Sequence, residues 1–120
     1  RLIRSGSHLA RHLADVPVLI LVCLEGDGAR QGRARLSLYA SVFPAVQNLL
    51  LAARGLGLGA TLTTIWRAHE EEIKTLLGIP PQVEAVALIP VGYPQRPFGP
   101  NQRRAVSEVT YYERWGRQEP

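Results

Sequence analysis

The feature that most constrains this chain is a nearly unbroken apolar stretch that runs into three closely spaced glycines, residues 41–64. Over residues 42–53 the side chains are apolar on almost every face of a helix, and only Gln47 and Asn48 interrupt them. A helix that is apolar all round lies inside a protein or between two copies of one. The sequence therefore predicts a buried helix over residues 41–54.

The ends of this helix have recognisable signals. Ser41 is the expected N-cap, and Pro44 then falls in the first turn, where the missing N–H has no intrahelical acceptor to lose. Gly55, Gly57 and Gly59 are expected to end the helix, because glycine adopts the left-handed conformation without a steric penalty. The apolar and β-branched run that follows, residues 60–65, predicts a strand.

Length and composition bound the class of protein. A chain of 120 residues is one domain or less, and 46% hydrophobic with 20% charged residues is enough for a folded core. The net charge is +4 and the excess is arginine, since Lys74 is the only lysine. Arginine suits forked hydrogen bonds to phosphate or carboxylate, although a GC-rich coding sequence would give the same bias. No basic stripe interleaved with aromatics is present, so nucleic-acid binding is not expected.

The number of cysteines and the hydropathy of the chain bear on the cellular compartment in which the protein is expected. The single cysteine, Cys23, excludes an internal disulfide, and its apolar neighbourhood predicts a buried small side chain. No run reaches the 18 or so apolar residues of a membrane span, and the first residues lack a signal-peptide pattern. We expect a cytoplasmic protein without a membrane partner. The absence of Met, even at position 1, suggests a piece of a longer chain.

The remaining sequence alternates between strand-like and helical patterns. Residues 16–24 predict a central strand covered on both faces, and residues 25–35 a surface loop. Residues 67–77 predict a second helix, and residues 84–93 a buried strand that is not hydrogen-bonded on both sides at Pro90. Residues 103–115 predict a closing segment with aromatic anchors. This alternation indicates an α/β or α+β layered sheet.

Few residues suggest chemistry directly. His8 and His12 have the i, i+4 spacing of a shared metal, but no third ligand completes a set, so a solvated helix face is favoured. The three glycines follow a helix instead of opening one, which excludes a dinucleotide-binding fingerprint. Thr61, Thr63 and Thr64 place hydroxyls at a strand end, where they could bind a heterocyclic nitrogen or simply satisfy strand propensity.

Several blocks together resemble the C-terminal part of the nitroreductase family of flavoproteins. No single block is specific, but their order and spacing through residues 17–116 are those of the family. The blocks are PAVQNLLLAA (44–53), GLGLGA (55–60), LLGIP (76–80), IPVGYP (89–94), RRAVSEV (103–109) and WG (115–116).

The resemblance implies an α+β fold with a mixed β-sheet flanked by helices, assembled as an intertwined homodimer with FMN at the subunit interface. Residues 1–120 would be the C-terminal portion of a single nitroreductase-like domain that lacks the N-terminal part of the fold. The family uses NAD(P)H to reduce the flavin, which then reduces nitroaromatics, quinones or similar small acceptors by hydride transfer at N5. The flavin performs the chemistry, so no catalytic side chain and no metal are expected.

Residue by residue, the resemblance places Leu62, Thr63 and Thr64 beside the flavin N5 edge, where hydroxyl or backbone N–H groups would tune it. Arg103 matches the basic residue on the FMN phosphate, with Arg104 as a neighbour that could substitute. Asn101 stands where many members have a second basic contact. The N-terminal phosphate motif lies upstream of this chain, so the alternative is a non-catalytic flavin-binding or flavin-sequestering protein of the same fold.

Overall fold

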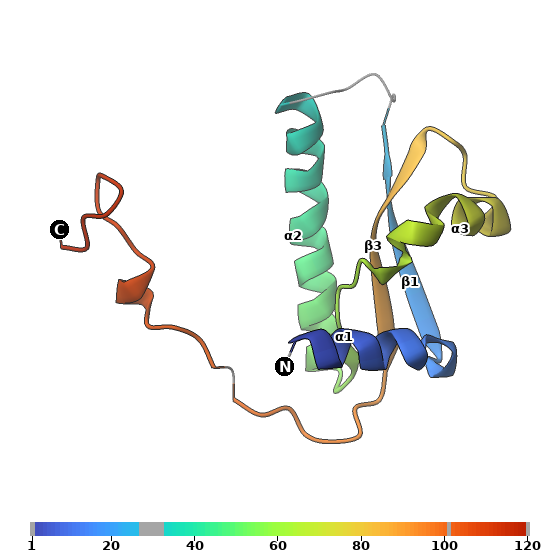
Figure 1. The fold of residues 1–120 in the computed structure, drawn as a ribbon, viewed down its shortest axis with the longest axis horizontal. Coiled ribbons are helices and arrows are strands. Elements are labelled where there is room, and N and C mark those ends of the chain that lie inside the picture. The colour runs from blue at the N-terminus through green and yellow to red at the C-terminus, as the bar shows by residue number, and fades with distance from the viewer. Residues whose placement is uncertain (1, 27–32, 101, 120) are drawn as a thin grey trace.

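The computed structural model describes residues 2–26, 33–100 and 102–119, and Figure 1 shows their arrangement. The longest element is helix α2 (Arg33–Gly55), and the longest strand is β3 (Val83–Gly92). In chain order the elements are α1 (Leu2–Arg11), the 3₁₀ turn η1 (Leu13–Asp15), β1 (Val18–Glu25), α2 (Arg33–Gly55), β2 (Gly59–Ala60), η2 (Ile65–His69), α3 (Glu70–Leu77), β3 (Val83–Gly92) and η3 (Val106–Glu108).

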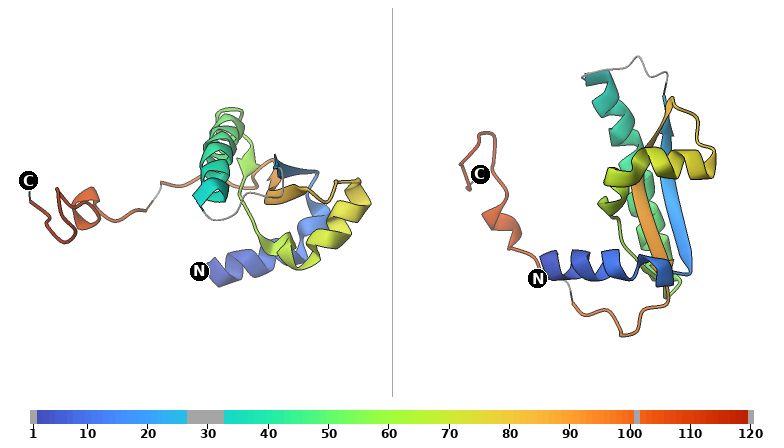
Figure 2. Two further views of the ribbon diagram at one scale, coloured as in Figure 1. Left: turned by 90° about the horizontal axis from the view of Figure 1, so that it is seen from above. Right: turned by 45° about the vertical axis from the view of Figure 1, so that its right-hand side comes forward.

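The described strands form one antiparallel sheet in the order β1-β3-β2. Helix α2 covers one face of this sheet, whereas α1 and α3 lie on the other, as the two views of Figure 2 show. The α+β class is thus confirmed. The resemblance implied a mixed sheet, but all three described strands run antiparallel to their neighbours.

The central strand is β3, and it holds most of the core. Its residues from Ala85 to Pro90 are all buried, and Ile89 and Ala87 are completely inaccessible. Residues 16–24 were predicted to supply the central strand, and this was wrong, because β1 lies at an edge of the sheet. Cys23 is accordingly exposed and not buried. An apolar run alone does not distinguish an edge strand from a central one.

A β-bulge in β3 changes which residues point to each face of the sheet. Val22 pairs with Ala87 and Cys23 with Ala85, so Val86 is an extra residue without a partner on β1. Ala87 packs with Val46 of α2, whereas Leu88 and Ala85 both pack with Trp66 on the other face. One inserted residue inverts the alternation of side chains along a strand. Each residue before the bulge therefore points to the opposite face from the one it would occupy in a regular strand.

Helix α2 begins eight residues earlier than the sequence predicted. It starts at Arg33, so Ser41 is not the N-cap and its hydroxyl instead donates to Ser37 O at 3.2 Å. Pro44 lies in the helix interior, not in its first turn. The predicted loop over residues 25–35 therefore ends in helix, while residues 27–32 lie outside the described part. The predicted helix end is confirmed: Gly57 has φ +77°, and Leu58 N–H donates to Ala53 O at 2.9 Å.

The strand between α2 and β3 is shorter than the predicted strand over residues 60–65. Only Gly59 and Ala60 form β2, and a single further bridge joins Thr63 to Leu88. The predicted helix over residues 67–77 is the 3₁₀ turn η2 followed by α3, and Gly78 ends it with φ +65° as expected. The β2 pairing skips Pro90, which confirms that this position is not paired on both sides.

The C-terminal segment, residues 93–100 and 102–119, runs away from the sheet and helices (Figure 1). The Cα radius of gyration is 17.7 Å, whereas a compact domain of this length has one of about 13.6 Å. The accessible surface is 9861 Å², against about 6,400 Å² for a compact monomer of this mass. The chain thus leaves more surface exposed than a compact monomer would, and large hydrophobic side chains such as Leu56, Tyr93 and Trp115 are part of it.

Part of this uncovered surface lies on α2. Leu36 and Leu51 are 68% and 59% exposed, and among the side chains described on this helix only Val46 and Ala53 are buried. Among the described residues, one helix, Arg35–Gly55, is long and apolar enough to cross a membrane by length and composition, with a mean hydropathy of 1.4. The expectation that no segment would reach that length was wrong, although helices between protein subunits meet the same criterion.

Candidate functional site

The turn after β2 is held by a clamp around Thr63. This residue is buried, its N–H donates to Leu88 O at 2.9 Å, and its carbonyl accepts from Leu88 N at 3.2 Å. The same carbonyl accepts the indole Nε1–H of Trp66 at 3.1 Å, and Thr63 Oγ1 accepts the N–H of Ile65 at 3.3 Å. The backbone N–H of Thr63 is therefore already used, and only its hydroxyl proton remains to be donated.

The residues on either side of Thr63 are different, because they are exposed. Thr64 precedes η2 and its side chain makes no capping hydrogen bond, while Leu62 is 37% exposed. Within the described residues, the N–H groups of Leu62 and Thr64 have no backbone acceptor. The clamp thus fixes a backbone on which two exposed residues have N–H groups without a backbone acceptor, and one of them, Thr64, also has a hydroxyl. A group that accepts hydrogen bonds could be held here without reorganisation of the turn.

The structure does not bring the predicted phosphate ligands to this turn within one chain. Arg103 and Arg104 are both exposed in the C-terminal segment, which extends away from the turn (Figure 1). The one hydrogen bond of the Arg103 guanidinium in the described part is to the neighbouring Gln102 O, at 3.3 Å. Asn101 lies outside the described residues. Both guanidinium groups are consequently available to a ligand or to another chain.

A polar cluster at the opposite end of β3 was missed by the sequence analysis. Arg35 Nη2 donates to Glu84 Oε1 at 2.8 Å, Arg35 Nε donates to Tyr39 Oη at 3.1 Å, and the Tyr39 hydroxyl donates to the same Glu84 oxygen. The bulge in β3 turns Glu84 to the α2 face, where these partners lie. No local pattern indicates the cluster, because Arg35 and Glu84 are 49 residues apart.

The electrostatics of this cluster follow from its hydrogen bonds. Burial alone would raise the pKa of Glu84, but hydrogen bonds from Tyr39 and Arg35 together lower that pKa below its ordinary value. The hydrogen bond to Glu84 is the main reason that the pKa of Tyr39 is raised, and the same carboxylate raises the pKa of Arg35. Glu84 is thus held as a carboxylate whose charge is compensated by Arg35.

His8 of α1 and His12, which directly precedes η1, do not make a metal site in the described chain. Their ring centroids are 4.4 Å apart with the rings tilted by 37°, and His12 Nδ1 lies 3.0 Å from Asp15 Oδ2. In the part of the chain that the structure describes, no group of three or more His, Cys, Asp or Glu side chains could hold a metal ion. These side chains border a shallow groove that also includes Thr61.

Taken together, a three-stranded antiparallel sheet, a long apolar helix and an exposed turn with free donors define an α+β protein of the nitroreductase type. The family model described as "Nitroreductase family" matches residues 4–93. The chain belongs to the nitroreductase family.

Individual relatives agree with this assignment. A protein of Methanothermobacter thermautotrophicus with the provisional name NADH dehydrogenase/NAD(P)H nitroreductase is 37% identical over 82 residues, which cover 67% of this chain and 41% of that protein. A solved structure from Bacteroides thetaiotaomicron, provisionally named in the same way, has a TM-score of 0.67 at 30% identity. The match covers 88% of this chain and 60% of that structure's chain.

A third comparison concerns the fold alone. The structure of a nitroreductase-like family protein from Bacillus cereus has a TM-score of 0.71 at 22% identity, with 92% of this chain covering 58% of that one. The chain therefore spans about two fifths of the curated relative and about three fifths of the solved structures.

Proposed function

We propose that residues 1–120 form the C-terminal portion of an FMN-dependent NAD(P)H oxidoreductase that reduces nitroaromatic, quinone or similar small acceptors. Membership in the family and the name of the Methanothermobacter relative support the oxidoreductase class. The observation that favours a flavin site is the turn at Thr63, because it fixes exposed donors on a clamped backbone. Such donors suit the N5 edge of an isoalloxazine ring.

The chemistry of the available groups fits FMN. The exposed N–H groups of Leu62 and Thr64 and the Thr64 hydroxyl can bond to acceptor atoms of the ring. The exposed guanidinium groups of Arg103 and Arg104 suit a phosphate, which arginine binds through forked, charge-assisted hydrogen bonds. Asn101 is a further candidate for the phosphate end. Because the two sets lie apart in one chain, the site draws on two subunits in this proposal.

When bound, FMN would supply the hydride chemistry, with NAD(P)H as the electron donor. The chain itself would position and tune the flavin. Thr63 holds the turn through Leu88 and Trp66, and Thr64 presents its N–H and hydroxyl to the ring edge. A donor that is already fixed stabilises developing charge without paying for its own orientation at the moment of reaction. No side-chain acid or base is required in this scheme.

A homodimer accounts for the surface that the chain leaves bare. The accessible surface of 9861 Å² exceeds that of a compact monomer by about 3,400 Å², which is on the scale of obligate interfaces. The exposed side of α2 and the extended C-terminal segment are the two features that a second copy would cover. We place this dimer in the cytoplasm, without a nucleic-acid or membrane partner.

The first test is the visible absorption spectrum of the purified protein, recorded before and after addition of FMN and removal of the excess by gel filtration. A retained flavin band that NAD(P)H bleaches without air supports the oxidoreductase. A band that is retained but not bleached favours the alternative, a flavin-binding protein without turnover. Absence of a retained band in the complete gene product would contradict both.

A second measurement tests the turn separately. Thr64→Ala removes the exposed hydroxyl, whereas Thr61→Ala is a matched variant on the same segment outside the clamp. The first change should shift the flavin reduction potential and the second should not. Equal potentials in both variants and the parent protein would remove the Thr64 hydroxyl from the proposed site.

A further inference from the structure

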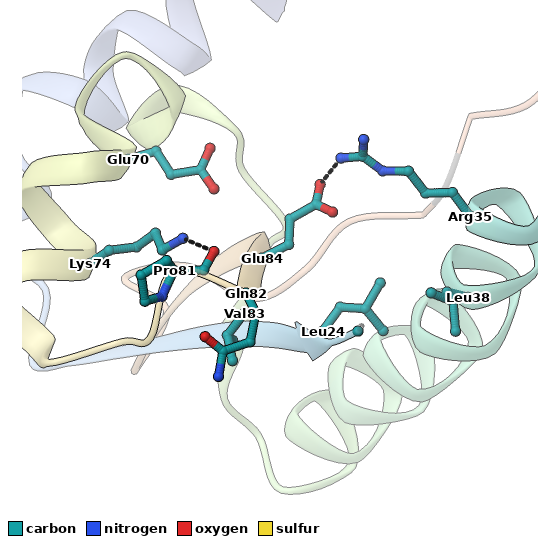
Figure 3. A pocket seen from close by; sticks show the side chains of 10 residues that line it. Leu24, Arg35, Leu38, Glu70, Lys74, Pro81, Gln82, Val83 and Glu84 are labelled. Atoms are coloured by element: carbon teal, nitrogen blue, oxygen red, sulfur yellow. Dashed lines mark hydrogen bonds and ion pairs between the residues drawn. The ribbon is translucent and has the colours of Figure 1, made fainter. Parts of the chain in front are cut away.

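A polar cavity of about 300 Å³ lies at the end of the sheet where β1 finishes and β3 begins (Figure 3). Leu88, the bridge partner of Thr63, and Glu84, which borders the cavity, are four residues apart on β3, roughly 12 Å along an extended strand. The cavity is thus separate from the proposed flavin turn. Its walls are formed by Leu24, Gly26, Arg35, Leu38, Glu70, Lys74, Pro81, Gln82, Val83 and Glu84.

One wall holds a buried ammonium group with spare donors. Lys74 is only 9% exposed, and its Nζ donates to Pro81 O at 3.0 Å. An ammonium group has three donors, and no carboxylate of the described residues lies within ion-pair distance of this one. Burial of a charge without a counter-ion is costly, and the cost falls when a ligand supplies the missing acceptors.

Two carboxylates on the same cavity also have free oxygens. Glu70 is half-buried and has no hydrogen bond or ion pair with any described residue. Glu84 Oε1 accepts from Arg35 and Tyr39, whereas no bond to its second oxygen is present in the described chain. Figure 3 shows the Glu70 carboxylate projecting from α3, whereas the Glu84 carboxylate is directed toward Arg35 of α2 at the end of the sheet. The cavity therefore offers acceptors as well as donors.

The remaining wall is apolar. Leu24 of β1, Leu38 of α2 and Val83 of β3 border the cavity beside the charged groups. The volume of about 300 Å³ is at the small end of ligand sites in proteins. A ligand that fills it would be small, with a short apolar body.

We propose that this cavity binds a small amphoteric molecule, one with a carboxylate, an ammonium group and a short apolar body, such as an apolar α-amino acid. Its carboxylate pairs with Lys74, its ammonium group pairs with Glu70 and the free oxygen of Glu84, and its side chain packs on Leu24 and Leu38. This inference does not depend on the proposed flavin chemistry.

The charge balance favours such a ligand over a simple ion. The four charged side chains on the walls, Arg35, Lys74, Glu70 and Glu84, sum to zero. A lone anion would gain Lys74 but approach two carboxylates, and a lone cation would meet the buried ammonium group. Only a molecule with both charges satisfies both sets of free groups. Glu70 and Lys74 are spaced i, i+4 on α3, yet they do not form an ion pair with each other.

The test is calorimetric titration of the purified protein with L-leucine and with two analogues of the same body. One analogue, 4-methylpentanoate, lacks the ammonium group, and the other, 3-methylbutylamine, lacks the carboxylate. L-leucine should bind at least about tenfold more tightly than either, because each lost charge-assisted pair costs about that factor. Equal affinity for leucine and one analogue, or no measurable binding, would overturn the proposal.

Variants locate the site. Glu70→Gln should reduce leucine affinity to that of 4-methylpentanoate, whereas Glu71→Gln, an exposed neighbour that does not border the cavity, should leave it unchanged. Lys74→Met keeps the apolar stem and should reduce leucine affinity to that of the amine. If loss of the hydrogen bond to Pro81 unfolds the Lys74 variant, the leucine affinities of the Glu70 and Glu71 variants still test the proposal. Identical leucine affinity in those two variants would contradict the assignment.

Discussion

Two regions of the molecule are packed differently. One is the sheet with its helices, residues 2–26 and 33–92, and the other is the C-terminal segment. In the sheet body, β3 buries six consecutive residues between α2 and α3. In the C-terminal segment beyond Phe98, the hydrogen bonds among the described residues join near neighbours, such as Tyr112 N–H to Arg117 O at 2.8 Å. It starts close to the body, where the Arg54 guanidinium lies 3.8 Å from the centre of the Phe98 ring, and then leaves it.

Apolar composition therefore does not by itself bury a segment. The C-terminal segment contains Val106, Tyr112 and Trp115, which are 75%, 43% and 91% exposed. Ile89 in β3 is completely buried because a strand lies on each side of it and helices cover both faces. In the proposed homodimer, the side chains of the C-terminal segment would pack on a surface supplied by the second copy, and four predictions test this contrast.

The largest expected effect is in the sheet body. Ile89→Ala should lower the free energy of unfolding by about 3 kcal/mol, through lost burial and the cavity that remains. Val106→Ala, measured at protein concentrations that keep the chain monomeric, should change it by less than about 0.5 kcal/mol. Urea unfolding followed by circular dichroism gives both values. Similar losses in the two variants would remove the contrast between the regions.

The second effect concerns assembly. Trp115→Ala should weaken the proposed dimer by about 2 kcal/mol, since a large exposed aromatic is the type of side chain that dominates interfaces. Gln118→Ala, an exposed polar neighbour, is the matched control. Sedimentation equilibrium over a dilution series measures the dissociation constant. A monomeric parent protein, or equal constants in both variants, would contradict the proposed role of the segment.

The third effect concerns the cofactor. Arg103→Ala should weaken FMN binding by about 1–3 kcal/mol, as expected for a lost charge-assisted hydrogen bond to phosphate. Arg96→Ala removes another exposed guanidinium from the same segment and should have little effect. Flavin fluorescence quenching measures both affinities. Unchanged FMN affinity in the Arg103 variant would refute its assignment to the phosphate.

The smallest effect is the pH dependence of the polar cluster in the body. Glu84→Gln should lower the free energy of unfolding by about 1 kcal/mol near neutral pH, because the charged hydrogen bonds from Arg35 and Tyr39 are weakened. The pKa of Glu84 is lowered in the folded state, so the carboxylate stabilises the fold above the unfolded value. This contribution should disappear as the pH falls below the ordinary value of 4.5.

The matched control for that prediction is Glu71→Gln, which replaces an exposed glutamate that does not border the cavity. Its effect on unfolding should stay within about 0.5 kcal/mol. Urea titrations at several pH values between 3 and 8 would show the difference between the two variants. A Glu84 effect that does not change across this range would contradict the role of the charged hydrogen bonds.

Local sequence patterns were enough to predict the type and order of the main elements. The apolar helix, its end at Gly57, the stop at Gly78 and the strand predicted over residues 84–93 and observed over 83–92 all follow from local rules of periodicity and glycine conformation. The ordered blocks also indicated the nitroreductase family, which the family model confirms. These features depend on residues that are neighbours in the chain.

The choice of central strand, the start of α2 and the meeting of the polar groups depend on long-range packing that local patterns do not contain. Residues 16–24 are as apolar as β3, yet they lie at the edge, because position in a sheet depends on the partners of the strand. The cluster of Arg35, Tyr39 and Glu84 depends on one extra residue at Val86, which turns Glu84 toward α2. A bulge is defined by pairing between strands more than sixty residues apart in the chain, and local sequence holds no record of that pairing.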